Sequence, residues 1–164
     1  MNIENHTRTM FVLLFFVLSI TSYAQTNGFN GSREEHDSLI KTGNEIRKAF
    51  ANSNVDSILL YHHPDVIKAL SYNKIEVGKA SLKPGLKGTL DSYKLEFVEN
   101  KIESLLINGE TAVEQTLFTI KGTPKGTGEP FVFKGRSMIV YVKYKKSPTG
   151  WATIREIIQP ATDN

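Results

Sequence analysis

The sequence contains no cysteine among its 164 residues. This absence excludes disulfides, thiolate chemistry and the lipid-modified cysteine that anchors bacterial lipoproteins. A strong charge imbalance is also lacking, because 20 basic and 17 acidic residues leave a formal net charge of only +3. So weak an imbalance predicts no nucleic-acid partner. Packing alone must stabilise the fold.

Long apolar runs are also lacking, apart from one of about eleven residues at Met10–Ile20. A transmembrane helix needs roughly 20 such residues, and small residues follow the run up to Ala24. The pattern predicts a signal peptide at 1–24, a flexible tether at 25–31 and one domain at 32–164. The mature protein is expected to be periplasmic or secreted and free of the membrane, the alternative being an uncleaved anchor.

Helical patterns occupy the first half of the predicted domain. Ser32 and Glu35 have the spacing of a capping box, and small or apolar residues then recur every three to four positions. Three helices are therefore expected: one over about 33–52, a short one carrying Ile58 and Leu59 that His63-Pro64 stops, and one over 78–93 that Pro84 kinks or delays.

Strand patterns occupy the second half, after a short predicted strand at 66–72. Asn108-Gly109 is a strong hairpin signal, since both turn positions require a positive φ. Four long strands are expected at 94–107, 111–121, 131–145 and 151–159, with Trp151 in the core or an interface. Helices followed by a meander predict an α+β fold with helices on one face of an antiparallel sheet.

Several short motifs occur in an order and spacing that resemble a known superfamily. They are DSILLYHHPD, VGKASL, INGETAV, GRSMIVYV and TGWATIRE, and the resemblance spans almost all of residues 33–160. The chain resembles the nuclear transport factor 2-like superfamily, in particular the exported bacterial members of its SnoaL-like and ketosteroid-isomerase-like branch. This resemblance implies a cone, in which three helices close a curved antiparallel sheet of four to six strands around a pocket. It also implies a homodimer formed through the outer sheet face.

The resemblance does not extend to the base used by ketosteroid-isomerase-like enzymes. That carboxylate would fall near Ala69 or Leu70, and neither side chain can accept a proton. The isomerase mechanism is therefore not transferred to this chain, and the superfamily's many activities cannot be separated by fold.

A dense polar cluster lies at Tyr61–Asp65. His63 and Asp65 are candidate catalytic residues, because a carboxylate can orient an imidazole as a general base. The alternative is that these side chains make local hydrogen bonds at a helix end and turn. Two adjacent histidines lack the i, i+4 spacing of metal ligands, so neither a metal nor a cofactor is predicted.

Polar residues also interrupt the apolar strands, and alternation should send about half of them inward. They are Glu114, Gln115, Arg136, Tyr141, Arg155 and Glu156. Glu156 is the third candidate catalytic residue. The predicted pocket set is Tyr61, His63, Tyr72, Arg136 and Glu156. The alternative is that the polar strand residues are ordinary residues on a solvent-facing or dimer-forming face of the sheet.

Two functions remain open at this point. The first is an exported domain that binds a small apolar or amphipathic molecule without catalysis. The second is a SnoaL-type or isomerase-type enzyme that performs acid–base chemistry on a small carbonyl or polyketide-like compound. Only the second requires a titrating side chain inside the pocket.

Overall fold

The computed structural model describes residues 30–71 and 73–162. Its helices are α2 (Arg33–Ala51), α3 (Val55–Leu60) and α4 (Gly78–Ser92). Its strands are β1 (His62–Ser71), β2 (Lys74–Val77), β3 (Tyr93–Asn108), β4 (Thr111–Pro124), β5 (Phe131–Lys143) and β6 (Trp151–Pro160). The predicted signal peptide and Tyr72 lie outside the described residues, so the signal peptide stays a prediction. Within the described part, no helix has the length and apolarity needed to cross a bilayer.

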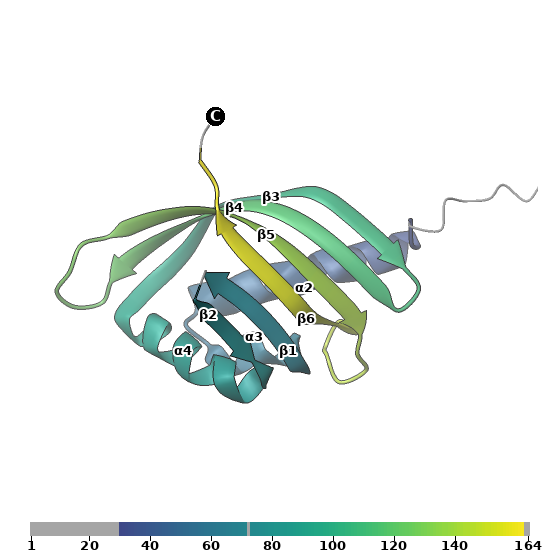
Figure 1. Ribbon diagram of the computed structural model, residues 1–164, viewed down its shortest axis with the longest axis horizontal. Coiled ribbons are helices and arrows are strands. Elements are labelled where there is room, and N and C mark those ends of the chain that lie inside the picture. Colours follow the sequence, from purple (N-terminus) through teal and green to yellow (C-terminus); the bar gives the residue numbers. More distant parts are fainter. Residues whose placement is uncertain (1–29, 72, 163–164) are drawn as a thin grey trace, which may run out of the picture.

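The six strands form one curved sheet in the order β2-β1-β6-β5-β4-β3, and the helices lie on its concave side (Figure 1). The meander β3-β4-β5-β6 is antiparallel throughout, which confirms the predicted α+β fold class. The sequence reading did not anticipate that β1 pairs with β6 in parallel. Register shifts in β3, after Phe97 and after Ile102, bend the long hairpin that β3 forms with β4.

The two faces of the sheet differ in burial. Along β4, Glu114, Thr116 and Phe118 are buried, whereas Gln115 and Leu117 between them are more exposed. Successive side chains of a strand point to opposite faces, so the buried set faces the helices. The concave face is thus the inner face of the molecule.

Helix α2 is fixed at its start and along its buried side. The capping box is formed, with the Glu35 backbone N–H donating to Ser32 Oγ at 3.2 Å and the Ser32 backbone N–H donating to Glu35 Oε2 at 2.8 Å. Leu39 of α2 is fully buried against Tyr141 and Trp151. The predicted core position of Trp151 is confirmed, and its indole N–H donates to Ser38 Oγ at 3.0 Å.

Two boundary predictions were wrong in this region. Strand β1 begins at His62 rather than at residue 66, with Pro64 inside it. The residue before a proline favours extended backbone, and the register of β1 on β6 shifts between His62 and Ile67, where the missing proline N–H is tolerated. Strand β2 was not predicted, although the sequence Lys74–Val77 alternates polar and apolar residues.

Candidate functional site

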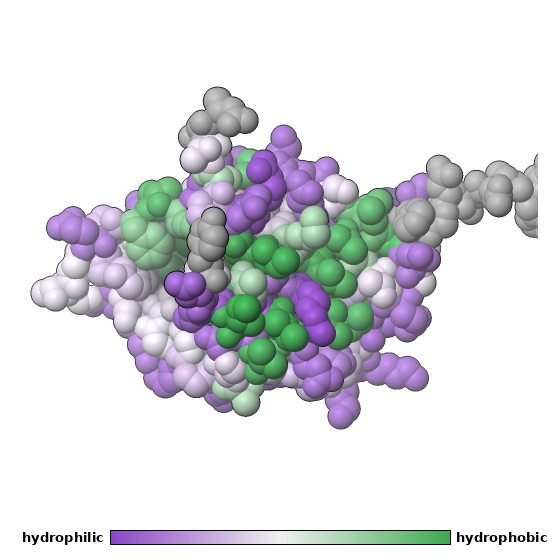
Figure 2. Space-filling model, viewed as in Figure 1, coloured by the Kyte–Doolittle hydropathy of each residue, from purple (hydrophilic) through white to green (hydrophobic). Residues whose placement is uncertain are grey.

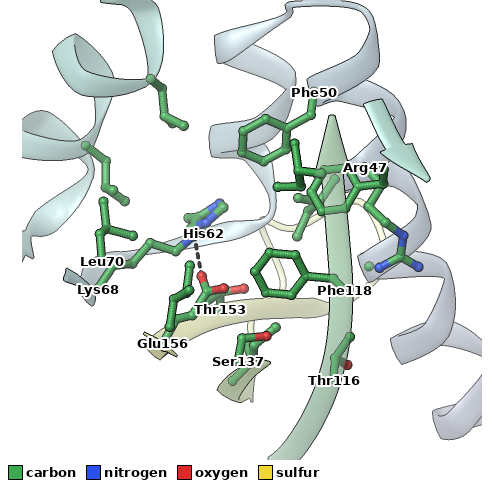
Figure 3. A pocket seen from close by; sticks show the side chains of 18 of the residues that line it. Arg47, Phe50, His62, Lys68, Leu70, Thr116, Phe118, Ser137, Thr153 and Glu156 are labelled. Atoms are coloured by element: carbon green, nitrogen blue, oxygen red, sulfur yellow. Dashed lines mark ion pairs between the residues drawn. The ribbon is translucent and has the colours of Figure 1, made fainter. Parts of the chain in front are cut away.

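A cavity of about 290 Å³ lies between the concave face of the sheet and helices α2 and α4. Every strand of the sheet contributes at least one lining residue. Figure 3 shows that the labelled side chains converge on it from α2 and from the strands β1, β6, β5 and β4. The cavity is at the small end of the range for ligand pockets, roughly 300–1,000 Å³.

One wall of the cavity is aromatic. Four phenylalanine rings from α2, β3, β4 and β5 form a continuous row, with centroid separations of 5.9 Å for Phe50 and Phe97, 6.2 Å for Phe97 and Phe118, and 5.9 Å for Phe118 and Phe133. Gly135 leaves room for this row, because a Cβ there would come within 2.7 Å of both Phe118 and Phe133. The row provides a surface on which a flat apolar group can stack.

Glu114 is the most enclosed acid of the cavity, with 2% of its surface exposed. The Thr116 hydroxyl donates to Glu114 Oε1 at 2.5 Å, and both residues face inward from β4. Burial raises the pKa of the Glu114 carboxyl, while the Thr116 hydrogen bond and the charge of Arg47 oppose that rise. A carboxyl in such surroundings holds a proton more readily than a solvated one.

Lys68 and Glu156 form an ion pair inside the cavity, with Lys68 Nζ 2.5 Å from Glu156 Oε2 and 11% of each side chain exposed. The two residues are register partners on the parallel strands β1 and β6, which places both side chains on the inner face. Figure 3 shows the pair next to His62. Glu156 was predicted to line the pocket, and it does.

His62 and Tyr141 are the most buried titratable residues of the cavity lining, each with 1% of its surface exposed. The Nδ1–H of His62 donates to the carbonyl oxygen of Ile58 at 2.9 Å. This contact is possible because the last turn of α3 lies directly beside the start of β1. Burial lowers the pKa of the imidazole well below 6.5, and the charge of Lys68 lowers it further. His62 is therefore neutral at pH 7, with its hydrogen on Nδ1 and a lone pair on Nε2.

The formal charges that line the cavity balance. The cations are Arg47, Lys68 and Lys74, and the carboxylates are Glu76, Glu114 and Glu156. Arg47 is held by two asparagines, with Nη1 donating to Asn100 Oδ1 at 3.1 Å and Nη2 to Asn44 Oδ1 at 2.6 Å. A lining without net charge favours a ligand without net charge, since an ion entering it would lose hydration with no net opposite charge to attract it.

Four of the five members of the predicted pocket set lie outside the cavity or outside the described residues, among them Arg136, Tyr61 and Tyr72. Arg136 points to the outer face, where it donates to both carboxylate oxygens of Glu103 at 2.7 and 3.0 Å and lowers the pKa of that carboxyl to about 2. The inward positions of β5 are the odd-numbered ones, which is why the prediction for Arg136 was wrong. Tyr61 caps the end of α3 and lines a separate hollow of about 150 Å³. Tyr72 lies outside the described residues.

His63 and Asp65 also lie away from the cavity. The His63 ring packs edge-on against Tyr144 at 4.9 Å, and the Asp65 backbone N–H donates to His63 Nδ1 at 3.2 Å. The Asp65 carboxylate is 3.7 Å from the same nitrogen and has 83% of its side chain exposed. These contacts are the local ones that the sequence left open as the alternative. Among the described residues, no group of three or more metal-ligating side chains is suited to a metal ion.

Sequence reasoning missed three inner residues of the site. Neither Arg47 nor Lys68 was assigned a role from the sequence, and His62 was passed over in favour of its neighbour His63. The alternation of side chains along the strand could have found His62. Once Val66 is taken as buried, residues 62, 66, 68 and 70 share one side if the strand extends back across Pro64.

A curved α+β sheet that closes over an inner cavity defines the class of fold, and comparison with known structures identifies it. The chain is similar to a nuclear transport factor 2-like superfamily protein from Salmonella enterica, with a TM-score of 0.64, 14% identity, and coverage of 80% of this chain and 92% of that one. It is similar to a ketosteroid isomerase-like protein from Erwinia carotovora, with a TM-score of 0.67, 15% identity, and coverage of 80% and 100%. It is also similar to an NTF2-like protein of unknown function from Pseudomonas putida, with a TM-score of 0.65, 13% identity, and coverage of 82% and 92%.

The chain therefore has the nuclear transport factor 2-like fold, and the predicted resemblance is confirmed at the level of fold. No family model and no curated protein matches the sequence. At these identities the likeness concerns the fold, so function has to be argued from the cavity residues.

Proposed function

We propose that this protein is an exported domain that binds a small, uncharged, amphipathic molecule in its inner cavity. The observation that carries the proposal is the division of one inner cavity into a phenylalanine wall and a polar end of balanced charge. The wall suits an apolar body, and the polar end suits one or two hydrogen-bonding groups that fix its orientation. Ile139 lies on this lining, on the inner face of β5.

Native mass spectrometry of the protein purified from its own host tests ligand and export together. We expect a bound compound that is released on unfolding, and a polypeptide mass that begins at Gln25. A mature chain with no adduct under any purification would argue against binding, whereas a full-length chain would argue against cleavage of the signal segment.

Filling the cavity is expected to abolish the adduct. Ile139→Trp places an indole in the cavity, so the bound compound should be lost while the circular dichroism spectrum stays that of the wild type. The matched control is Val132→Trp on the outer face of the same strand, where Val132 is 70% exposed. The control should keep the adduct; retention of the adduct by Ile139→Trp would place the ligand elsewhere.

Acid–base catalysis is the second candidate, and two buried groups favour it. Glu114 has a raised pKa and His62 has a fixed neutral tautomer, so one enclosed site contains a carboxyl that can hold a proton and an imidazole that can accept one. The test is exchange of carbon-bound hydrogens of the co-purified compound in D2O. Catalysis predicts exchange that Glu114→Gln slows, and an absence of exchange leaves binding as the function.

The outer face of the sheet suggests how two copies would associate. Three exposed apolar residues, Ile75, Ile157 and Met138, lie in one cross-strand row on β2, β6 and β5, with Ala69 of β1 between the first two. Figure 2 shows apolar side chains gathered on this face over β1, β2 and β6. Exposed apolar patches of this kind mark interaction sites, and a continuous sheet face can pair with its own copy about a two-fold axis. We propose a homodimer through this face.

Introducing charge into this row is expected to separate the dimer. The double variant Met138→Lys, Ile157→Lys would bring four buried cations together in the interface, so its dissociation constant in sedimentation velocity should rise at least about tenfold. Leu60→Lys on α3 is the control, because Leu60 is 50% exposed but far from the sheet face. A wild-type protein that sediments as a monomer would contradict the proposal.

A further inference from the structure

The polar end of the cavity contains an acceptor, Nε2 of His62, that is open to the hollow. His62 is 1% exposed and its Nδ1–H is used by Ile58, but nothing in residues 30–71 and 73–162 hydrogen-bonds to its Nε2. The neighbouring polar groups do have partners: Glu114 accepts from Thr116, and Lys68 pairs with Glu156. An acceptor that faces the cavity takes its hydrogen-bond partner from whatever fills that cavity, so it points to a donor supplied by the occupant.

We infer that the molecule bound in the cavity carries a hydroxyl group, and that this hydroxyl donates its hydrogen to His62 Nε2. The inference rests on the proposed binding function and names the chemical class of the ligand: a small alcohol or phenol with an apolar body.

The hydrogen-bonding capacity of the site favours a hydroxyl over other oxygen groups. A ketone or an ether has no hydrogen for the Nε2 lone pair and would set two acceptors against each other. A carboxylate beside His62 would need a free cation there, but the neighbouring ammonium of Lys68 is already paired with Glu156. That ammonium has three hydrogens and lies beside the imidazole, so it can also donate to the oxygen of the same hydroxyl.

The phenylalanine wall of the cavity determines which shape of apolar group the ligand can have. The phenylalanine row begins at Phe50 on α2 and ends at Phe133 on β5, so it spans the cavity across the sheet. A ring stacks on such a row with less loss of conformational freedom than a flexible chain, because a ring has few torsions to fix. The site therefore fits a hydroxylated ring better than a linear alcohol.

A pair of probes that differ only at the hydroxyl tests the inference in the wild-type protein. The probes are 4-tert-butylphenol and its methyl ether, 4-tert-butylanisole, titrated at pH 7 by calorimetry. The phenol should bind about tenfold more tightly, as expected for one buried hydrogen bond. In a spectrum of 15N-labelled protein, the phenol but not the ether should shift the His62 Nε2 resonance.

Two variants assign the preference to His62. His62→Phe removes the acceptor and should reduce the phenol-to-ether ratio to about one, whereas His62→Gln keeps an acceptor oxygen and should preserve part of it. Equal binding of both probes by the wild type overturns this inference and leaves the binding function standing. Binding of neither probe overturns both. A preference for the phenol that survives in His62→Phe assigns the hydroxyl to another residue and also overturns the inference.

Discussion

Replacement of Lys68 by methionine is expected to lower the free energy of unfolding by about 3–5 kcal/mol, because it leaves the Glu156 carboxylate buried without its cation. The two side chains are 11% exposed and their charged atoms are 2.5 Å apart. Removing one member of a buried pair exposes the full desolvation cost of the other. Urea denaturation followed by tryptophan fluorescence measures the change, since Trp151 is fully buried.

The double variant Lys68→Met, Glu156→Leu separates the desolvation cost from loss of packing. With both charges gone, its stability should return to within about 1 kcal/mol of the wild type, since apolar replacements of a buried pair are often neutral or stabilising. Lys83→Met is the surface control: Lys83 is 2.8 Å from Asp56, but the side chains are 56% and 80% exposed, so the change should stay below about 1 kcal/mol. A double variant as unstable as Lys68→Met would show that the lysine acts by packing and not by charge.

The parts of the fold that the sequence predicted are those with local signals. The capping box at Ser32 and Glu35 starts α2, and the predicted hairpin joins β3 to β4. Its turn is Gly109-Glu110, one residue later than predicted: Gly109 has a φ of 55°, and Asn108 is still paired with Thr111. Each depends on residues within four positions of one another, so sequence alone contains the information. The parallel pairing of β1 with β6 joins segments some ninety residues apart, as between Lys68 and Glu156, and no local pattern specifies it.

The site was predicted less well than the fold. When both faces of a curved sheet are partly apolar, the alternation of residues along a strand does not show which side chains point inward. On β4 the inner set includes Glu114 and Phe118, and the outer set includes Gln115 and Leu117. Either assignment places one charged or amide side chain inward, so hydrophobicity does not choose between them. On β6 the same reasoning selected Glu156 correctly, and on β5 it selected Arg136 wrongly.

The inner position of His62 follows from the connection between α3 and β1. Helix α3 ends at Leu60, and Tyr61 is the single residue between that helix and the strand. The imidazole therefore remains within reach of the Ile58 carbonyl one turn back, which fixes its tautomer. The short connection gives this one side chain both a hydrogen-bond partner in the helix and a position on the cavity wall.

Acidification below pH 6.5 is expected to destabilise the protein through His62. The unfolded chain binds a proton at this histidine near pH 6.5, whereas burial and Lys68 hold the pKa well below that value in the folded state. The unfolded state thus binds more protons, so the stability contributed by neutral His62 is complete above pH 6.5 and is lost as the pH falls toward the folded-state pKa. The loss approaches about 1.4 kcal/mol per pH unit for this one proton.

The comparison of wild type with His62→Gln between pH 7 and pH 5 isolates this contribution. The charges of Lys68 and Lys79 act on the imidazole, and Glu114 and Glu156 line the same cavity. Both proteins keep these four residues, so their effect cancels to first order in the difference. The raised pKa of Glu114 acts in the opposite direction, because a carboxyl that is harder to ionise when folded favours the folded state as the pH falls. The slope of unfolding free energy against pH should therefore be shallower in His62→Gln than in the wild type. Identical slopes for wild type and His62→Gln would mean that His62 takes up its proton while folded, and its Nε2 could not then serve as the acceptor of the cavity.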